Sequence, residues 1–202
     1  MDLYKFHSNP ETLYGHDRAD EIVPERIYNI AESGKKLTNK QEDVLTKDAE
    51  YAYMYARDVL KKPWPKAEDT IAKDTEYAYW YTLNVLKKPW PKGENAIAKD
   101  PRYAYWYARD VLKKPWHKAE DTIAKNTQFA YFYAYYILKK PWPKGEDVIA
   151  KDPEYAYQYT RNILRKPWPK GEDAIAKDYQ HAQLYALNVL KLPKDAAKRW
   201  PK

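Results

Sequence analysis

Neighbouring acidic residues are the side chains of this sequence best suited to catalysis. Glu68-Asp69 and Glu120-Asp121 belong to a set of five such pairs. Two carboxylates can act as general acid and general base when different surroundings separate their pKa values. These pairs all recur at the same place, near the start of a predicted helix, so their surroundings are equivalent. We therefore interpret them as acids that interact with the helix dipole, and we predict that the protein is not an enzyme.

Histidines and glycines are the remaining candidates for a metal or phosphate site. The histidines share no metal-ligand spacing, and the chain contains no cysteine. They are His7, His16, His117 and His181. Gly93, Gly145 and Gly171 alternate with alanine at one repeated position instead of forming a phosphate-binding loop. We therefore expect no metal, no cofactor and no catalytic residue.

These residues recur because the sequence repeats every 26 residues between Asp43 and Lys198. The tripeptide Tyr-Ala-Tyr returns in five units, with Phe129 in place of its first tyrosine in the fourth copy, and becomes His181-Ala182-Gln183 in the last unit. A Pro-Trp pair keeps the same register in five units. Its tryptophans are Trp64, Trp90, Trp116, Trp142 and Trp168. A fixed short period is typical of a solenoid, in which each unit buries its apolar face against its neighbours.

Each unit predicts two helices, as residues 65–90 illustrate. A proline opens helix A, which covers about residues 65–73, because a first-turn residue needs no N–H partner. Asp74 is a typical N-cap and begins helix B, which we expect to run to Lys87 or Lys88. The proline that follows cannot continue the helix, so the chain must turn.

Helix B carries most of the predicted core. Its packing residues recur at intervals of three and four, as on one face of an amphipathic helix. In this unit they are Ala78, Tyr79, Thr82, Val85 and Leu86. Helix A adds Ile71. The sequence therefore predicts an all-α fold, an α-solenoid of about six helix-turn-helix repeats with a degenerate repeat at the N-terminus.

The ends of the array differ from its middle. We divide the chain into an N-terminal segment with the degenerate capping repeat (residues 1–42), the repeat array (43–198) and a tail (199–202). Residues 22–33 form the degenerate repeat, and residues 1–16 fall outside the period. In the last unit Lys194 replaces the tryptophan, which gives this terminal repeat a polar outer face.

The segment Lys151–Tyr159, KDPEYAYQY, resembles a known kind of repeat. Short helical repeats with a KDPEYAYxYAxxVLK-type consensus occur in uncharacterised phage and bacterial proteins, and the resemblance covers about residues 43 to 192. It implies a phage or bacterial origin and a small accessory role in a host process. It implies no catalytic or binding residues.

Some positions of helix B vary between units although the framework does not. One position holds Met54, Trp80, Trp106, Phe132 and Gln158 in successive units. The pair that follows at three and four residues holds Arg57-Asp58, Leu83-Asn84, Arg109-Asp110, Tyr135-Tyr136 and Arg161-Asn162. We expect both positions of the pair to face outward. The variable stripe predicts the surface that binds a partner protein, through Trp80, Trp106, Arg109, Phe132, Tyr135, Tyr136 and Arg161.

Two other kinds of function stay open. The net charge is +7, and lysine pairs such as Lys61-Lys62 lie two residues before each tryptophan, so cations and aromatic rings could bind nucleic acid. Alternatively, the lysines end the helices and the tryptophans fill the seam between units. An array could also be a structural protein that assembles end to end, which the charged last unit disfavours.

The sequence also bears on location. It has no cysteine, its first 20 residues lack the apolar core of a signal peptide, and no apolar run reaches the roughly 20 residues of a membrane-spanning helix. We therefore expect a soluble cytoplasmic protein, in the host cytoplasm if a phage encodes it, that does not bind membranes.

Overall fold

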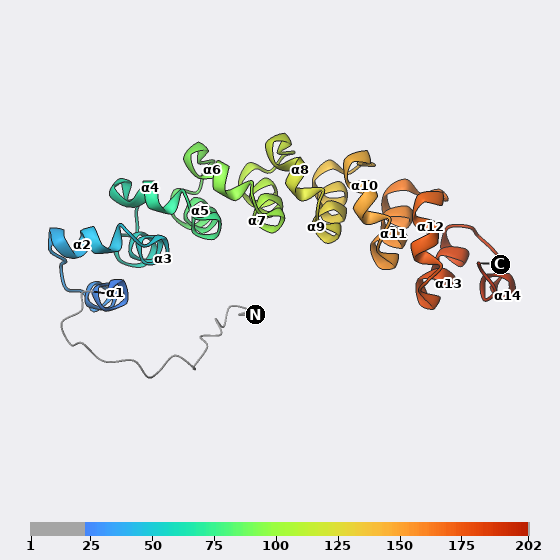
Figure 1. Cartoon of the computed structure of the whole chain (residues 1–202), viewed down its shortest axis with the longest axis horizontal. Coiled ribbons are helices and arrows are strands. Elements are labelled where there is room, and N and C mark those ends of the chain that lie inside the picture. The colour runs from blue at the N-terminus through green and yellow to red at the C-terminus, as the bar shows by residue number, and fades with distance from the viewer. Residues whose placement is uncertain (1–22, 202) are drawn as a thin grey trace.

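The computed structural model describes residues 23–201, and in that range it consists of helices and turns without a strand. The predicted all-α repeat fold is therefore confirmed. Helices A and B alternate along the chain and stack into an arch (Figure 1). Helices A lie on the outer side of the arch, and helices B lie on the inner side.

The helix bounds follow the period. Helices A are α2 (Asn39–Leu45), α4 (Glu68–Ile71), α6 (Pro91–Ile97), α8 (Glu120–Ile123), α10 (Pro143–Ile149) and α12 (Pro169–Ile175). Helices B begin as α3 (Ala49–Met54), α5 (Thr75–Tyr81), α7 (Pro101–Trp106), α9 (Thr127–Phe132), α11 (Pro153–Tyr159) and α13 (Tyr179–Asn188). Two helices flank them, α1 (Pro24–Glu32) and α14 (Lys194–Ala197).

Helices B begin where the sequence predicts because a polar side chain caps each N-terminus. The Oδ1 atom of Asp74 accepts hydrogen bonds from the backbone N–H groups of Glu76 and Tyr77, both at 2.9 Å. At α2, Thr38 and Gln41 form a reciprocal capping box. These bonds satisfy N–H groups that have no partner inside the helix.

Helices B end differently from the prediction. The second halves of five of them are π-helical. These segments are η1 (Tyr55–Leu60), η3 (Thr82–Leu86), η4 (Tyr107–Leu112), η6 (Tyr133–Leu138) and η7 (Thr160–Leu164). The N–H of Lys87 bonds the carbonyl of Thr82 five residues back at 2.8 Å, and Lys87 itself is left-handed, with φ 54°. Helix B therefore ends at Leu86, one residue before the predicted end at about Lys87 or Lys88, because left-handed Lys87 is its C-cap.

One repeated position determines how helix A begins. A Cβ atom added to Gly93 would lie 2.5 Å from the ring of Trp90, so the α-helical first turn of α6 has no room for a methyl group there. Two other units carry alanine at this position. They begin with a tighter 3-10 turn, η2 (Pro65–Ala67) or η5 (His117–Ala119).

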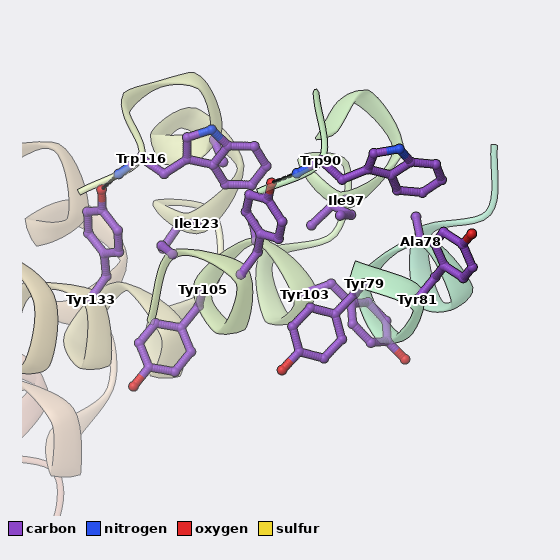
Figure 2. Packing of buried hydrophobic residues seen from close by; sticks show 14 of the residues in the cluster. Ala78, Tyr79, Tyr81, Trp90, Ile97, Tyr103, Tyr105, Trp116, Ile123 and Tyr133 are labelled. Carbon is purple, nitrogen blue, oxygen red and sulfur yellow. Dashed lines mark hydrogen bonds between the residues drawn. The ribbon is translucent and has the colours of Figure 1, made fainter. Parts of the chain in front are cut away.

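The core lies between the two layers and is continuous from unit to unit (Figure 2). Ala78, Tyr79 and Thr82 are buried as predicted, whereas Val85 and Leu86 are half-buried. Helix A of each unit also buries one aliphatic residue, which is Leu45 in α2 and an isoleucine such as Ile71 in the later units. The small residues on helix B allow close approach of the neighbouring helices, because large side chains would hold their backbones apart.

Ion pairs join successive helices A on the outer side. Lys92 lies 2.9 Å from Asp69 of the preceding unit, and Lys144 lies 2.8 Å from Asp121. These groups are largely exposed, so solvent screens each pair and its contribution to stability is small. Weak but regular ion pairs therefore connect the units on the outer side, while the buried core contributes most of the stability of the array.

Both ends of the array extend beyond the predicted boundaries. Helix α2 begins at Asn39, so the first helix A crosses the expected boundary between residues 42 and 43. Trp200, which was assigned to the tail, packs its ring 5.1 Å from that of Tyr185 and belongs to the C-terminal cap. It folds back to the place that a tryptophan of the regular Pro-Trp series takes in earlier units. The expected tail or cap at residues 1–16 lies outside the described residues.

Candidate partner-binding face

Three of the predicted contact residues form a stripe on helices B. Trp80, Trp106 and Phe132 come from the equivalent position of α5, α7 and α9. Figure 2 shows their neighbours Tyr79 and Tyr105 on the side of helices B that points away from the buried tryptophans. The ring of Trp106 lies 5.8 Å from Tyr79 and 6.4 Å from Trp80, and Phe132 lies 5.9 Å from Tyr105. All three residues are half-buried. We call them the inner stripe because helices B form the inner side of the arch.

The two predicted contact arginines differ in how they are held. The guanidinium of Arg109 donates two hydrogen bonds to Asp110, at 2.6 and 2.8 Å, and lies 5.2 Å from the ring centre of Tyr105. The bond with Asp110 is the main reason why the pKa of Arg109 is raised. Arg161 is exposed and makes no ion pair with another described residue. Arg161 is thus the arginine available to bind an anionic group.

A hydrogen bond joins successive helices B at a position expected to face outward. The hydroxyl of Tyr79 donates to Asp110 at 3.0 Å, and the amide of Asn162 donates to Tyr131 at 2.9 Å. Three further seams have the same kind of bond. They join Tyr28 with Asp58, Tyr53 with Asn84, and Tyr157 with Asn188. The prediction that both members of each variable pair face outward is therefore wrong for Asp58, Asp110 and Asn162, which are half-buried and help to align neighbouring units, whereas Asn84 and Tyr136 are exposed as predicted.

The fourth unit interrupts this series of bonds. Tyr136 stands where the other units carry aspartate or asparagine, and Tyr105 instead bonds Arg109 of its own helix. Tyr135 and Tyr136 are 39% and 54% exposed. The ring of Tyr135 stacks on Tyr131 at 5.8 Å, with 11° between the planes, and meets Tyr136 edge to face at 4.8 Å. The two tyrosines are thus surface residues, as predicted, and their contact with a partner stays a prediction.

Two pockets lie in the grooves between successive helices B. The first, of about 560 Å³, lies between units one and two and includes Glu50, Glu76 and Trp80 in its lining. The second, of about 770 Å³, lies between units four and five, and Lys139 and Arg165 line it together with Tyr135 and Tyr136. We call them the acidic pocket and the basic pocket.

Six charged residues outside the predicted set line these pockets: Glu50, Arg57 and Glu76 in the first, and Lys139, Lys140 and Arg165 in the second. A signal was present in the repeats, because the position of Glu50 changes from glutamate to Arg102 and Gln128 in later units. The sequence did not show that this change alters the charge of a pocket, because only the stacked structure reveals which side chains share a groove.

The lysine pairs and the tryptophans that follow them, which were the candidate contacts for nucleic acid, differ in exposure. Both lysines of the pairs, such as Lys61-Lys62, are exposed. The five tryptophans are only 6–8% exposed, and each packs against the ring of a buried tyrosine. These tryptophans fill the seams between units and have no face available for stacking on bases.

The residues first considered for chemistry have structural partners. Glu120 accepts a hydrogen bond from buried Tyr133 at 3.1 Å, so the first acid of a pair packs across helices as well as facing the helix dipole. His117 and His181 each lie within 2.9 Å of an acid in their own helix region. Within residues 23–201, no cluster of His, Asp and Glu is arranged to hold a metal. His7 and His16 lie outside the described residues.

None of the described helices combines the length and the apolar character needed to cross a bilayer. Comparison with known proteins gave no match to a family model, a curated protein or a solved structure.

Proposed function

We propose that this protein is a non-enzymatic scaffold that binds an extended segment of a partner protein on the inner side of its arch. The observation that carries the proposal is the inner stripe, in which Trp80, Trp106 and Phe132 are half-buried at the same position of consecutive helices. Large aromatic side chains that are grouped at a surface typically mark a protein interface. The framework does not require them, because sister units carry Met54 and Gln158 at the same position.

The shape of this surface supports an extended ligand. Solenoids bind partners along their concave sides because successive units present equivalent side chains at regular steps. The inner stripe follows this direction across α5, α7 and α9. Tyr135 and Tyr136 continue it on the next part of helix B, in η6, and contribute exposed phenol rings, which are favoured at interface centres.

Nucleic acid is the second candidate, and the exposed lysine pairs favour it. Phosphates could bind along the row of cations at the ends of helices B, because each neutralised phosphate releases a counterion. We rank it below a protein ligand because the tryptophans beside the lysines are buried and cannot stack on bases. Self-assembly ranks third, since Trp200 covers Tyr185 at the C-terminal end.

The cytoplasm of a bacterial or phage-infected cell is the setting we propose. The lack of cysteine suits a reducing compartment. The phage or bacterial source rests on the resemblance of the repeats alone.

A comparison of two baits tests the proposal. Trp106 and Phe132 are both replaced by glutamine, the residue at position 158 of the sister unit, and proteins captured by wild type and variant are quantified by mass spectrometry. We expect the melting temperature to stay within a few degrees and a specific set of captured proteins to disappear. Equal capture by both baits contradicts the proposal.

A further inference from the structure

The acidic pocket combines two carboxylates with aromatic side chains. Glu50 and Glu76 are its carboxylates, and Arg57 on its edge is already bound to Asp58 through two bonds of 2.6 Å. The Nε1–H of Trp80 donates to Glu76 at 3.3 Å, so the indole and the carboxylate form one wall. Aromatic walls attract cations through their ring faces, and the stem of a lysine or arginine can pack on them while its charged end meets a carboxylate.

The basic pocket has the opposite charge. Lys139, Lys140 and Arg165 line it without an acidic residue. None of these three cations makes an ion pair with another described residue. The exposed rings of Tyr135 and Tyr136 form its apolar part. An anionic side chain that enters this pocket meets three cations without competition from a built-in carboxylate.

The difference between the pockets arises from substitutions in otherwise equivalent units. In unit four, Gln128 stands where units one and two carry Glu50 and Glu76, and Tyr136 stands where unit one carries Asp58. In unit one the charge of Lys61 acts on Asp58, so the tyrosine at position 136 removes the acid nearest to Lys139. Both pockets lie in grooves between neighbouring helices B, the acidic one mainly along the first halves of its helices and the basic one at their C-terminal ends.

The distance between the pockets sets the length of a ligand that could reach both. They are three units apart, and packed helices lie about 8–10 Å apart, so the span is about 25–30 Å. An extended chain covers about 3.3–3.6 Å per residue, so roughly eight or nine residues bridge it. Trp80 of the inner stripe lines the acidic pocket, and Trp106 lies on a helix between the two pockets, where it would contact the apolar middle of such a segment.

We infer that the partner segment is itself charge-polarised, with a lysine or arginine in the acidic pocket and an aspartate, glutamate or phosphorylated side chain in the basic pocket. The inference rests on the proposed function and specifies the partner. Nucleic acid does not fit it, because a uniformly anionic chain would place phosphates against Glu50 and Glu76.

A peptide selection tests the inference without knowledge of the natural partner. Random twelve-residue peptides displayed on phage are selected on the full chain, and the enriched sequences are synthesised and measured by fluorescence anisotropy. We expect basic residues near one end and acidic residues near the other. Two variants, Glu50→Lys with Glu76→Lys and Lys139→Glu with Lys140→Glu, should each weaken binding about tenfold or more. Peptides in which glutamate replaces the basic residues should recover affinity for the first variant.

Matched variants serve as controls. Glu154→Lys changes the residue equivalent to Glu50 in unit five, and Lys113→Glu with Lys114→Glu changes the lysine pair of unit three; neither site lines the acidic or the basic pocket. Both controls should bind the selected peptides within about twofold of wild type. Circular dichroism of every variant shows whether the fold is kept.

The outcomes separate the two proposals. If the selected peptides need Trp106 for binding but lose equal affinity with the pocket variants and the control variants, the partner segment is not charge-polarised. The proposal that the protein is a protein-binding scaffold would still hold. If no peptide that depends on residues of the inner side is enriched, both proposals are overturned. Oligo-dT binding that Glu50→Lys and Glu76→Lys strengthen also overturns both, in favour of nucleic acid.

Discussion

The hydroxyl of Tyr133 accepts a hydrogen bond from the backbone N–H of Trp116 at 2.8 Å, although the two residues are 17 positions apart (Figure 2). The same hydroxyl donates to Glu120 at 3.1 Å. One buried phenol therefore fixes the turn before helix A, helix A itself and the next helix B. Equivalent bonds at Tyr81, Tyr107, Tyr159 and Tyr185 repeat this joint along the array.

Removal of this hydroxyl should destabilise the array. We expect Tyr133→Phe to lower the free energy of unfolding by about 1–3 kcal/mol, because the N–H of Trp116 and the carboxylate of Glu120 lose their partner inside the protein. Urea unfolding followed by circular dichroism measures the change. Tyr135→Phe, at an exposed ring, should alter stability by no more than about 0.5 kcal/mol, and equal effects of the two changes would contradict the role of the joint.

The tryptophan of the same joint should matter more. Trp116 is buried and packs 4.8 Å from Tyr107. Trp116→Ala should therefore cost about 3–5 kcal/mol, because it leaves a large cavity between two units. Stability that stays unchanged while binding of RNA or single-stranded DNA is lost would reverse our assignment and make the residue a nucleic-acid contact.

The left-handed lysines predict a stabilising substitution. Lys113 has φ 54°, a conformation that costs about 1 kcal/mol for a residue with a side chain and little for glycine. Lys113→Gly should raise the free energy of unfolding by up to about 1 kcal/mol. Lys114 follows it and lies outside the left-handed region, so Lys114→Gly should be neutral or slightly destabilising. The same response at both positions would show that left-handed strain is not the cause.

The buried tyrosines predict loss of structure at high pH. Burial is the largest cause of the raised pKa values of Tyr81, Tyr107, Tyr133 and Tyr159, whose ordinary value is 10.0. Above pH 10 the unfolded chain releases these phenol protons while the folded chain keeps them, so stability is full below pH 10 and falls as the pH rises. A titration that follows helix content and tyrosinate absorbance together should show both changing in one step. Ionisation of all the tyrosines near pH 10 with the helices intact would contradict it.

The sequence predicted the repeat, the helix starts and the buried face because these features have local signals. Asp74 caps a helix from its own sequence position, and Ala78 lies on a visible apolar stripe. The π-helical ends had no such signal, since left-handed caps usually carry glycine and here carry lysine. The bond between Tyr79 and Asp110 joins residues 31 positions apart and becomes evident only when the units are stacked. Trp200 was missed because it lies outside the period.

The tyrosine pair of unit four connects the framework with the proposed function. Tyr135→Arg with Tyr136→Asp recreates the residues of unit three, and the new aspartate can accept a hydrogen bond from Tyr105 as Asp110 does from Tyr79. We expect an unchanged or slightly higher melting temperature and loss of partner binding. A large fall in stability with binding retained would instead place the two tyrosines in the core.

Site-specific photo-crosslinking tests the central claim, a protein ligand on the inner side of the arch, most directly. A photoreactive phenylalanine analogue is placed at Phe132 on the inner stripe and, in a second protein, at Lys118 on the outer helices. After irradiation in cells of the native host, we predict protein adducts from position 132 and few from position 118. Adducts only with nucleic acid, or equal protein adducts from both positions, would contradict the account.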